Sequence, residues 1–351
     1  MKSSPMKNPF DSFYHVPNSQ TLLDIAFRRS MKSSAQVSKN APILIKAKKK
    51  EGRRIHVAIK TIVDKILKII KSVPMIDELP DFYRELASTI VDTEKLKLTL
   101  GKLNGILPVL SKIEREYLGK LGRIEEPKEG DRIRRAVFGR ISSILKKQDE
   151  NLTYLNQIRG KLREIPSIDY NMPCVVIAGA PNVGKSSIVK HISTNKKINV
   201  QEYPFTTKKL ILGHITLERR FDTLRVQIMD TPGILDRPMS ERNSIELQAI
   251  LALRHISELI VFIFDPSLAS GYSVESQITL YEEIKENFTK KGNIDLITVF
   301  NKKDLASPSE IENLRKELSI EAEDYFLTNA LTGENLDELK EYIIKRYMDD
   351  Q

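Results

Sequence analysis

Residues 174–192 constrain the fold more than any other part of this chain of 351 residues. The short apolar run CVVIAG leads into Gly179-Ala-Pro-Asn-Val-Gly184-Lys185-Ser186, and a helical pattern follows. In this spacing the backbone N–H groups of the turn converge on phosphate oxygens, and the N-terminus of the helix adds positive potential. The segment therefore predicts a phosphate-binding loop between a strand and a helix. The alternative is a strand–helix turn that contains glycine and binds no ligand.

Similar apolar runs recur at about 223–230, 258–264 and 294–300, each followed by a loop and a helical pattern. Strands that alternate with helices indicate a mostly parallel sheet covered by helices on both faces. We expect six strands, in an α/β domain that spans residues 171–351. Ligands in such sheets bind at the carboxyl ends of the strands.

Two polar motifs follow two of these runs. Asp230-Thr-Pro-Gly233 ends the run LRVQIMD, and Asn301-Lys-Lys-Asp304 follows DLITVF. The carboxylate of Asp304 can accept from both N1–H and the exocyclic amine of guanine, whereas adenine offers neither group at these positions. These motifs predict a Ras-like P-loop GTPase domain that binds GTP or GDP with Mg²⁺.

Each candidate site residue has an expected role. Lys185 reaches the β- and γ-phosphates, the Gly233 N–H senses the γ-phosphate, Asn301 contacts N7 and ties back to the phosphate-binding loop, and the Lys302 stem lies on the base. Thr207, with Thr206 beside it in YPFTT, is expected to close over Mg²⁺, although Thr and Phe are also ordinary strand residues. The expected metal ligands are Ser186, Thr207 and Asp230. The expected nucleotide-binding residues are Gly179, Ala180, Pro181, Asn182, Val183, Gly184, Lys185, Ser186, Ser187, Thr206, Thr207, Asp230, Gly233, Asn301, Lys302, Asp304, Asn329 and Ala330.

The chain lacks the glutamine that orients the attacking water in Ras-like GTPases, so another group would have to assist hydrolysis. Ras-like enzymes place a Gln after the glycine of the second motif to orient water, and this chain has Ile234 there. Asn182 is a candidate ligand for K⁺, a cation that could stabilise the transition state; its alternative role is to form the turn. The candidate catalytic residues are Lys185, Asn182, Thr207 and Gly233.

Residues 1–170 differ from the rest in charge and in periodicity. They hold 34 Lys and Arg against 20 Asp and Glu, whereas the remainder holds 22 against 27. Apolar residues at helical spacing predict an all-α bundle, with Ser19 capping the first helix, a kink at Pro108 and one long helix over about 131–164. The positive balance favours a polyanionic partner, although a solvated basic surface would have the same composition. The candidate RNA contacts are Lys48, Lys49, Lys50, Arg53, Arg54, Arg132, Arg135 and Arg140.

Other features of the chain point to a soluble intracellular protein. No run reaches the ~18 apolar residues that span a bilayer, and the N-terminus has no secretory h-region. The single cysteine, Cys174, opens the first strand and is expected to be a core residue. We expect a monomer that is cytoplasmic, or nucleolar or nuclear in a eukaryote, and that contacts no membrane.

Several segments resemble a known family. The segments GAPNVGKSS, YPFTTK, DTPGILDRP, ERNSIELQAILALRHI and FDPSLASGYSVESQ, together with LLDIAFRRS, RRAVFGRISSILKKQDENLTYLNQIR and PSID in the basic half, are similar to the Nog (nucleolar G-protein) family of Obg-like GTPases. The resemblance implies a GTPase switch in assembly of the large ribosomal subunit, with rRNA and proteins of its precursors as partners. Because no long C-terminal extension follows the α/β half, an archaeal-type short member is expected. Asn329 stands where the family usually has serine.

Two other functions remain as alternatives to a switch in ribosome assembly. They are a nucleotide-gated RNA or protein binding module, and a GTPase in tRNA modification or stress signalling.

Overall fold

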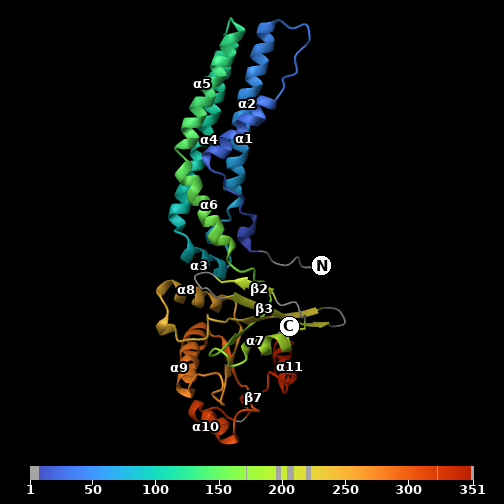
Figure 1. The fold of residues 1–351 in the computed structure, drawn as a ribbon, viewed down its shortest axis with the longest axis vertical. Coiled ribbons are helices and arrows are strands. Elements are labelled where there is room, and N and C mark those ends of the chain that lie inside the picture. Colours follow the sequence, from blue (N-terminus) through green and yellow to red (C-terminus); the bar gives the residue numbers. More distant parts are fainter. Residues whose placement is uncertain are drawn as a thin grey trace. The chain divides into compact units, whose positions relative to one another are not determined.

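The structure is a computed structural model that describes residues 8–170, 172–194, 199–203, 209–218, 223–321 and 323–348. Its internal contacts form two units (Figure 1). Pro9–Ile76 and Ile90–Arg163 form the helical unit, and Asp77–Thr89 packs with the chain from Glu164 onward to form the sheet unit. The boundary predicted at residue 170 therefore differs from the contact boundary. The hydroxyl of Tyr83, in α3 (Asp81–Ile90), accepts from the Ile168 N–H at 2.9 Å and holds these two segments of the sheet unit together.

The helical unit contains a 3-10 turn η1 (Pro9–Ser12) and the helices α1 (Ser19–Lys32), α2 (Ile43–Ser72), α4 (Thr93–Gly122), α5 (Pro127–Lys146) and α6 (Asp149–Arg163). Asn18, not Ser19, caps α1, because its side chain accepts from the Thr21 N–H at 2.8 Å. Pro108 lies inside α4, which continues past it. The single helix predicted over 131–164 is wrong, since a turn at residues 147–148 separates α5 from α6.

A buried ion cluster ties two long helices of this unit together. Glu51 of α2 is almost fully buried and accepts from Arg54 at 2.9 Å and from Arg134 of α5 at 2.8 Å. A buried carboxylate is tolerated only with such partners. Around it, α2 packs on both α4 and α5 through isoleucines that recur at helical spacing, among them Ile55, Ile59 and Ile62.

The sheet unit contains one sheet in the order β2-β3-β4-β1-β5-β6-β7. Its strands are β1 (Cys174–Ala178), β2 (Asn199–Glu202), β3 (Lys209–Glu218), β4 (Thr223–Asp230), β5 (Leu259–Phe264), β6 (Asp295–Phe300) and β7 (Tyr325–Leu327). The pairs β2–β3 and β3–β4 are antiparallel and the other four pairs are parallel. The described residues thus form seven strands, and the prediction of six was wrong. The edge strand β2, NVQE, is short and mostly polar, and carries no apolar pattern.

Helices cover both faces of this sheet. They are α7 (Lys185–Ile192), α8 (Ser244–Ala252), α9 (Val274–Ile284), α10 (Pro308–Leu318) and α11 (Leu336–Arg346). Two 3-10 turns, η3 (Met239–Glu241) and η4 (Leu253–His255), flank α8, the π-helix η5 (Lys285–Lys290) continues α9, and the 3-10 turn η2 (Ile76–Glu78) lies where the chain passes from the helical unit into the sheet unit. Residues of α7 and α11 pack on one face of β1 and β5, and Tyr281 of α9 packs on Phe262 and Phe264 of the other. Both central strands are completely buried. The confirmed α/β fold leaves the carboxyl ends of β1, β4, β5, β6 and β7 along one edge.

Candidate nucleotide-binding site

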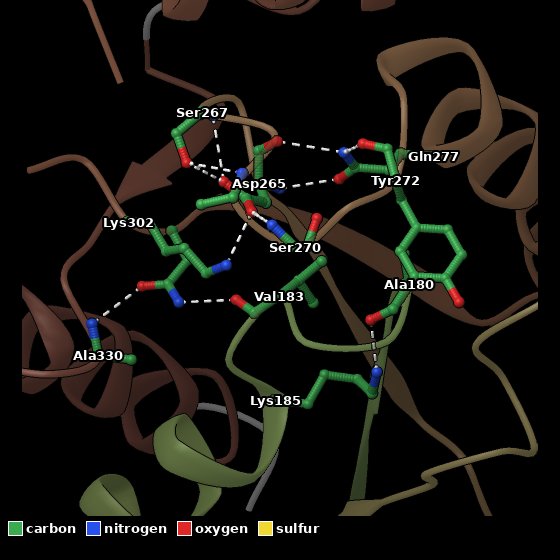
Figure 2. Close-up of polar contacts among 12 residues, drawn as sticks. Ala180, Val183, Lys185, Asp265, Ser267, Ser270, Tyr272, Gln277, Lys302 and Ala330 are labelled. Carbon is green, nitrogen blue, oxygen red and sulfur yellow. Dashed lines mark hydrogen bonds and ion pairs between the residues drawn. The ribbon is translucent and has the colours of Figure 1, made fainter. Parts of the chain in front are cut away.

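The turn after β1 has the backbone of a phosphate-binding loop. Gly179 and Gly184 have φ angles of 137° and 106°, in the region that favours glycine. A Cβ at Gly179 would lie 2.4 Å from the carbonyl oxygen of Ile263 in β5. Lys185 is 6% exposed and donates to the carbonyl oxygen of Ala180 at 2.7 Å (Figure 2). It also donates to the carbonyl oxygen of Gly179 at 2.8 Å. Burial lowers the pKa of this ammonium group, which would gain stabilisation from a nearby phosphate.

The end of β4 places a carboxylate beside this loop. The Ser186 hydroxyl donates to Oδ2 of Asp230, which is fully buried. Oδ1 of Asp230 has no hydrogen-bond partner among the residues described. Burial raises the pKa of Asp230, against the opposing effects of Ser186 and Lys185. A hydroxyl oxygen beside a buried, unsatisfied carboxylate oxygen is a donor set that fits Mg²⁺.

Asn301, directly after β6, joins three loops. Its Nδ2 donates to the carbonyl oxygen of Val183 at 2.8 Å, and its Oδ1 accepts from the Ala330 N–H at 2.9 Å (Figure 2). The same Oδ1 also accepts from the Thr328 hydroxyl at 3.1 Å. A Cβ at Gly184 would lie 2.2 Å from Nδ2 of Asn301. Residue 184 must therefore be glycine for this bridge to form. The loops after β1, β6 and β7 are held in one arrangement by a single amide.

The loop after β5 contains a carboxylate, Asp265, for which the sequence patterns predicted no role. Asp265 is fully buried and accepts from the Ser267 N–H at 3.1 Å, the Ser270 N–H at 2.6 Å and Nζ of Lys302 at 2.8 Å, as Figure 2 shows. Burial alone would raise the pKa of Asp265, but the hydrogen bonds from Lys302 and the two serines outweigh it and lower the pKa. Gln277 of α9 also joins this network, accepting from the Asp265 N–H at 2.8 Å. The backbone of Lys302 has a φ of 58°, a conformation unusual for lysine.

A second network of unexpected residues holds the loop after β4. The Gly233 N–H donates to Oδ2 of Asp236 at 2.6 Å. The guanidinium of Arg242 donates to the carbonyl oxygens of Gly233, at 2.9 Å, and Ile234, at 2.8 Å, and lies 3.4 Å from Oδ1 of Asp236. Both side chains fall within segments that carry the family resemblance, DTPGILDRP and ERNSIELQAILALRHI. Periodicity and spacing alone did not assign either of them a contact.

The remaining candidate residues lie as follows. Thr206 and Thr207 fall outside the described residues. Asn182 is exposed with a φ of 62°, as a turn-forming asparagine would be, while Pro181 is half-buried and Ser187 and Asp304 are exposed. Asn329 turns its side chain onto its own loop, accepting from the Leu331 N–H at 2.9 Å. Cys174 is buried, as predicted, and burial raises its pKa to about 12.

Comparison with known proteins places this site in a family. The model of the NOG1 N-terminal helical domain matches residues 10–169, and that of nucleolar GTP-binding protein 1 (NOG1) matches residues 244–304. An uncharacterized protein of Methanocaldococcus jannaschii is 34% identical over 306 residues, which cover 87% of this chain and 83% of that protein. The chain belongs to the NOG1 family. The resemblance inferred from the sequence is thereby confirmed.

Eukaryotic relatives match equally well over this region. Nucleolar GTP-binding protein 1 of Drosophila melanogaster is 34% identical over 88% of this chain, and that of Saccharomyces cerevisiae is 32% identical over 86%. The chain spans 46% of the length of each of these two relatives. No helix among the described ranges is long and apolar enough to cross a bilayer.

Half of the candidate RNA contacts of the helical unit already have partners within it. Lys48 donates to the carbonyl oxygen of Gly122 at 2.8 Å. Three arginines form ion pairs: Arg54 with Glu51, Arg135 with Asp131 and Arg140 with Glu116. Lys49, Lys50, Arg53 and Arg132 are exposed.

A basic groove lies along α2 and includes only one of these candidates, Arg53. A cavity of about 380 Å³ between α1 and α2 shares Asp64 with a second cavity of about 430 Å³ farther along α2. We define the α2 basic groove by the six cations that line these cavities: Arg29, Lys32, Arg53, Lys60, Lys68 and Lys71. Asp64 and His56 are the other titratable residues that line the groove, and the remaining five lining side chains are uncharged.

Proposed function

We propose that this chain binds GTP and GDP with Mg²⁺ and hydrolyses GTP to GDP and phosphate. The observation that carries the proposal is the Asn301 bridge, since it fixes a phosphate-binding loop against the two loops that would hold the base. Lys185 supplies a buried positive charge for the phosphates. The names of the relatives support the same nucleotide.

The proposed metal ligands are Ser186, Asp230 and Thr207. The Ser186 hydroxyl, at the start of α7, donates to Asp230 at the end of β4, and the unsatisfied Oδ1 of Asp230 supports the assignment. When bound, Mg²⁺ would neutralise charge on the phosphates. Within the chain, the hydrogen bond from the Ser186 hydroxyl to Asp230 holds these two ligand oxygens next to each other.

Guanine selection is assigned to the loop after β6. The Asp304 carboxylate would accept from N1–H and the exocyclic amine, and the Lys302 stem, held by Asp265, would lie against the ring. The loop after β7 is assigned two roles: it faces the base, and it positions Asn301, because the Ala330 N–H donates to Oδ1 of Asn301. ATP would leave the Asp304 carboxylate without its two donors.

For hydrolysis, we assign Lys185, Gly233 and Thr207 to the γ-phosphate and Asn182 to a K⁺ ion. The test is phosphate release by the full chain in K⁺ and in Na⁺, for the wild type, Lys185→Ala and Asn182→Ala. Lys185→Ala should lose nucleotide binding and turnover. If Asn182 binds K⁺, the wild type should be faster in K⁺, and Asn182→Ala should remove the difference; equal rates in the two salts would contradict this role.

We further propose that residues 1–170 bind RNA of large ribosomal subunit precursors, and that the nucleotide state of the sheet unit times binding or release. The α2 basic groove supports this, because its four α2 cations lie along a span of about 27 Å at 1.5 Å per residue. Lys and Arg that neutralise phosphates provide affinity without base readout, and this affinity falls steeply with salt.

The ribosomal role is tested by co-sedimentation with ribosomal subunits and their precursors in GTP, GDP and a non-hydrolysable GTP analogue. Lys60→Glu/Lys68→Glu/Lys71→Glu should abolish association with the large subunit, whereas Lys97→Glu/Lys102→Glu/Lys112→Glu, on exposed positions of α4, should retain most of it. Association that is equal for both triple variants would contradict the groove. No association of the wild type in any nucleotide would contradict the ribosomal role and favour a tRNA or protein partner.

A further inference from the structure

The Gly233 N–H already has an anionic acceptor. It donates to Oδ2 of Asp236 at 2.6 Å, with Gly233 at a φ of 74°. The proposed function assigns this same N–H to an oxygen of the γ-phosphate. One N–H cannot donate a strong bond to both oxygens, so the carboxylate and the γ-phosphate compete for it.

The carboxylate is held in place from behind. Arg242, whose side chain is 1% exposed, binds the carbonyl oxygens of Gly233 and Ile234 and lies 3.4 Å from Oδ1 of Asp236, whose side chain is 11% exposed. Burial lowers the pKa of Arg242, and the negative charge of Asp236 opposes this shift. Arg242 therefore keeps both the loop and the competing carboxylate in register with the Gly233 N–H.

Asp236 also acts on the phosphate site electrostatically. Its charge counteracts the burial that lowers the pKa of Lys185, and it adds to the burial that raises the pKa of Asp230. A negative charge that is felt by both the phosphate-binding lysine and the proposed metal ligand would repel a γ-phosphate. GDP has no phosphate at that position and leaves the bond between Gly233 and Asp236 intact.

We propose that Asp236 sets the preference between GTP and GDP by occupying the Gly233 N–H that the γ-phosphate would otherwise use. This inference rests on the proposed function. GTP must displace the carboxylate, which lowers its affinity relative to GDP, and displacement frees the loop that begins at Gly233 to rearrange. Loss of the γ-phosphate lets Asp236 return.

The test measures equilibrium affinities of the full chain for GDP and for a non-hydrolysable GTP analogue in Mg²⁺. Asp236→Asn keeps the size and can still accept from the N–H but lacks the charge, and Asp236→Ala removes both. We expect the ratio of analogue affinity to GDP affinity to rise about tenfold or more in Asp236→Ala and by a smaller factor in Asp236→Asn. A tenfold change in affinity corresponds to the free energy of about one charge-assisted hydrogen bond. Asp295→Asn, an exposed carboxylate at the opposite end of β6, is the matched control and should leave the ratio unchanged.

The outcomes separate the two proposals. Failure of the wild type to bind either nucleotide would overturn the proposed function. Binding of both by the wild type, with a ratio that stays within twofold in Asp236→Ala and Asp236→Asn, would overturn only the role of Asp236. A fall in single-turnover hydrolysis at an unchanged ratio would also overturn it and make Asp236 a water-positioning group. Circular dichroism of each variant tests whether the chain is folded. If Asp236→Ala does not fold, the ratio of analogue affinity to GDP affinity is measured on Asp236→Asn instead.

Discussion

Replacement of Asp265 by asparagine should destabilise the sheet unit more than any isosteric change at its surface. The carboxylate accepts from four donors, namely the N–H groups of Ser267 and Ser270, the Ser267 hydroxyl and the Lys302 ammonium. An asparagine side chain has one acceptor oxygen, and its NH₂ group would face donors. At least one N–H would lose its partner, and Lys302 would lose its counter-charge.

The magnitude follows from these two losses. An unsatisfied buried donor costs about 1–3 kcal/mol, and a hydrogen bond to a charged group contributes about 1.5–3 kcal/mol. The Lys302 side chain is 20% exposed and can regain part of its hydration, so the lower part of each range applies. We therefore expect a loss of about 3 kcal/mol in the free energy of unfolding of the sheet unit, close to the value for breaking a buried ion pair.

Hydrogen exchange as a function of urea, followed on the amides of β5 and β6, measures this loss in the sheet unit alone. Glu286→Gln is the matched control, because its carboxylate is exposed and pairs with Lys290 and Lys291, which are exposed as well. It should change the unfolding free energy by less than about 1 kcal/mol. A loss below about 1 kcal/mol in Asp265→Asn would show that the four donors find other partners and would refute the reasoning.

Three further predictions follow from the described contacts. The pKa of Asp265 is lowered in the folded state, so the ionised carboxylate stabilises the fold fully above its unfolded pKa of about 4, and this stabilisation is lost as pH falls through the folded pKa. The urea midpoints of the wild type and Asp265→Asn should therefore differ by a constant amount at about pH 5–8 and converge as pH falls below about 4. Glu51→Gln should destabilise the helical unit by about 3 kcal/mol, seen as faster hydrogen exchange in α2 and α5, whereas Glu94→Gln, in an exposed pair with Lys97, should not. Gly184→Ala should weaken nucleotide binding by at least about tenfold, because its Cβ would displace Asn301, whereas Gly101→Ala, in open space on α4, should leave binding unchanged and raise stability by about 0.5–1 kcal/mol.

Local patterns predicted the parts of the site that lie next to one another in sequence. The candidate phosphate-binding turn after β1, and the positions of Asp230 at the end of β4 and of Asn301 directly after β6, follow from apolar runs and from the rule that ligands bind at strand ends. The contacts of Asp265 and Asp236 could not be predicted in the same way. Their partners Lys302 and Arg242 lie 37 and 6 residues away, and only the folded loops bring the charges together.

The errors in the predicted fold have physical causes. The strand β2 is polar and pairs at the edge of the sheet, so its backbone hydrogen bonds to β3 define it and its side chains do not. The break between α5 and α6 contains neither glycine nor proline. There the Asp149 side chain accepts from the Ser19 N–H at 2.9 Å, a contact between segments 130 residues apart that the helical period does not reveal.

The central claim, a guanine nucleotide site, is tested most directly by competition. Fluorescent GDP bound to the full chain in Mg²⁺ is displaced with GTP or ATP, and with xanthosine triphosphate for Asp304→Asn. GTP should displace it at concentrations at least about 1,000-fold lower than ATP, since adenine leaves the Asp304 carboxylate unpaired, and Asp304→Asn should lose this preference and gain affinity for the xanthine nucleotide. Displacement by ATP within about tenfold of GTP, or an unchanged preference in Asp304→Asn, would contradict the assignment of a guanine site.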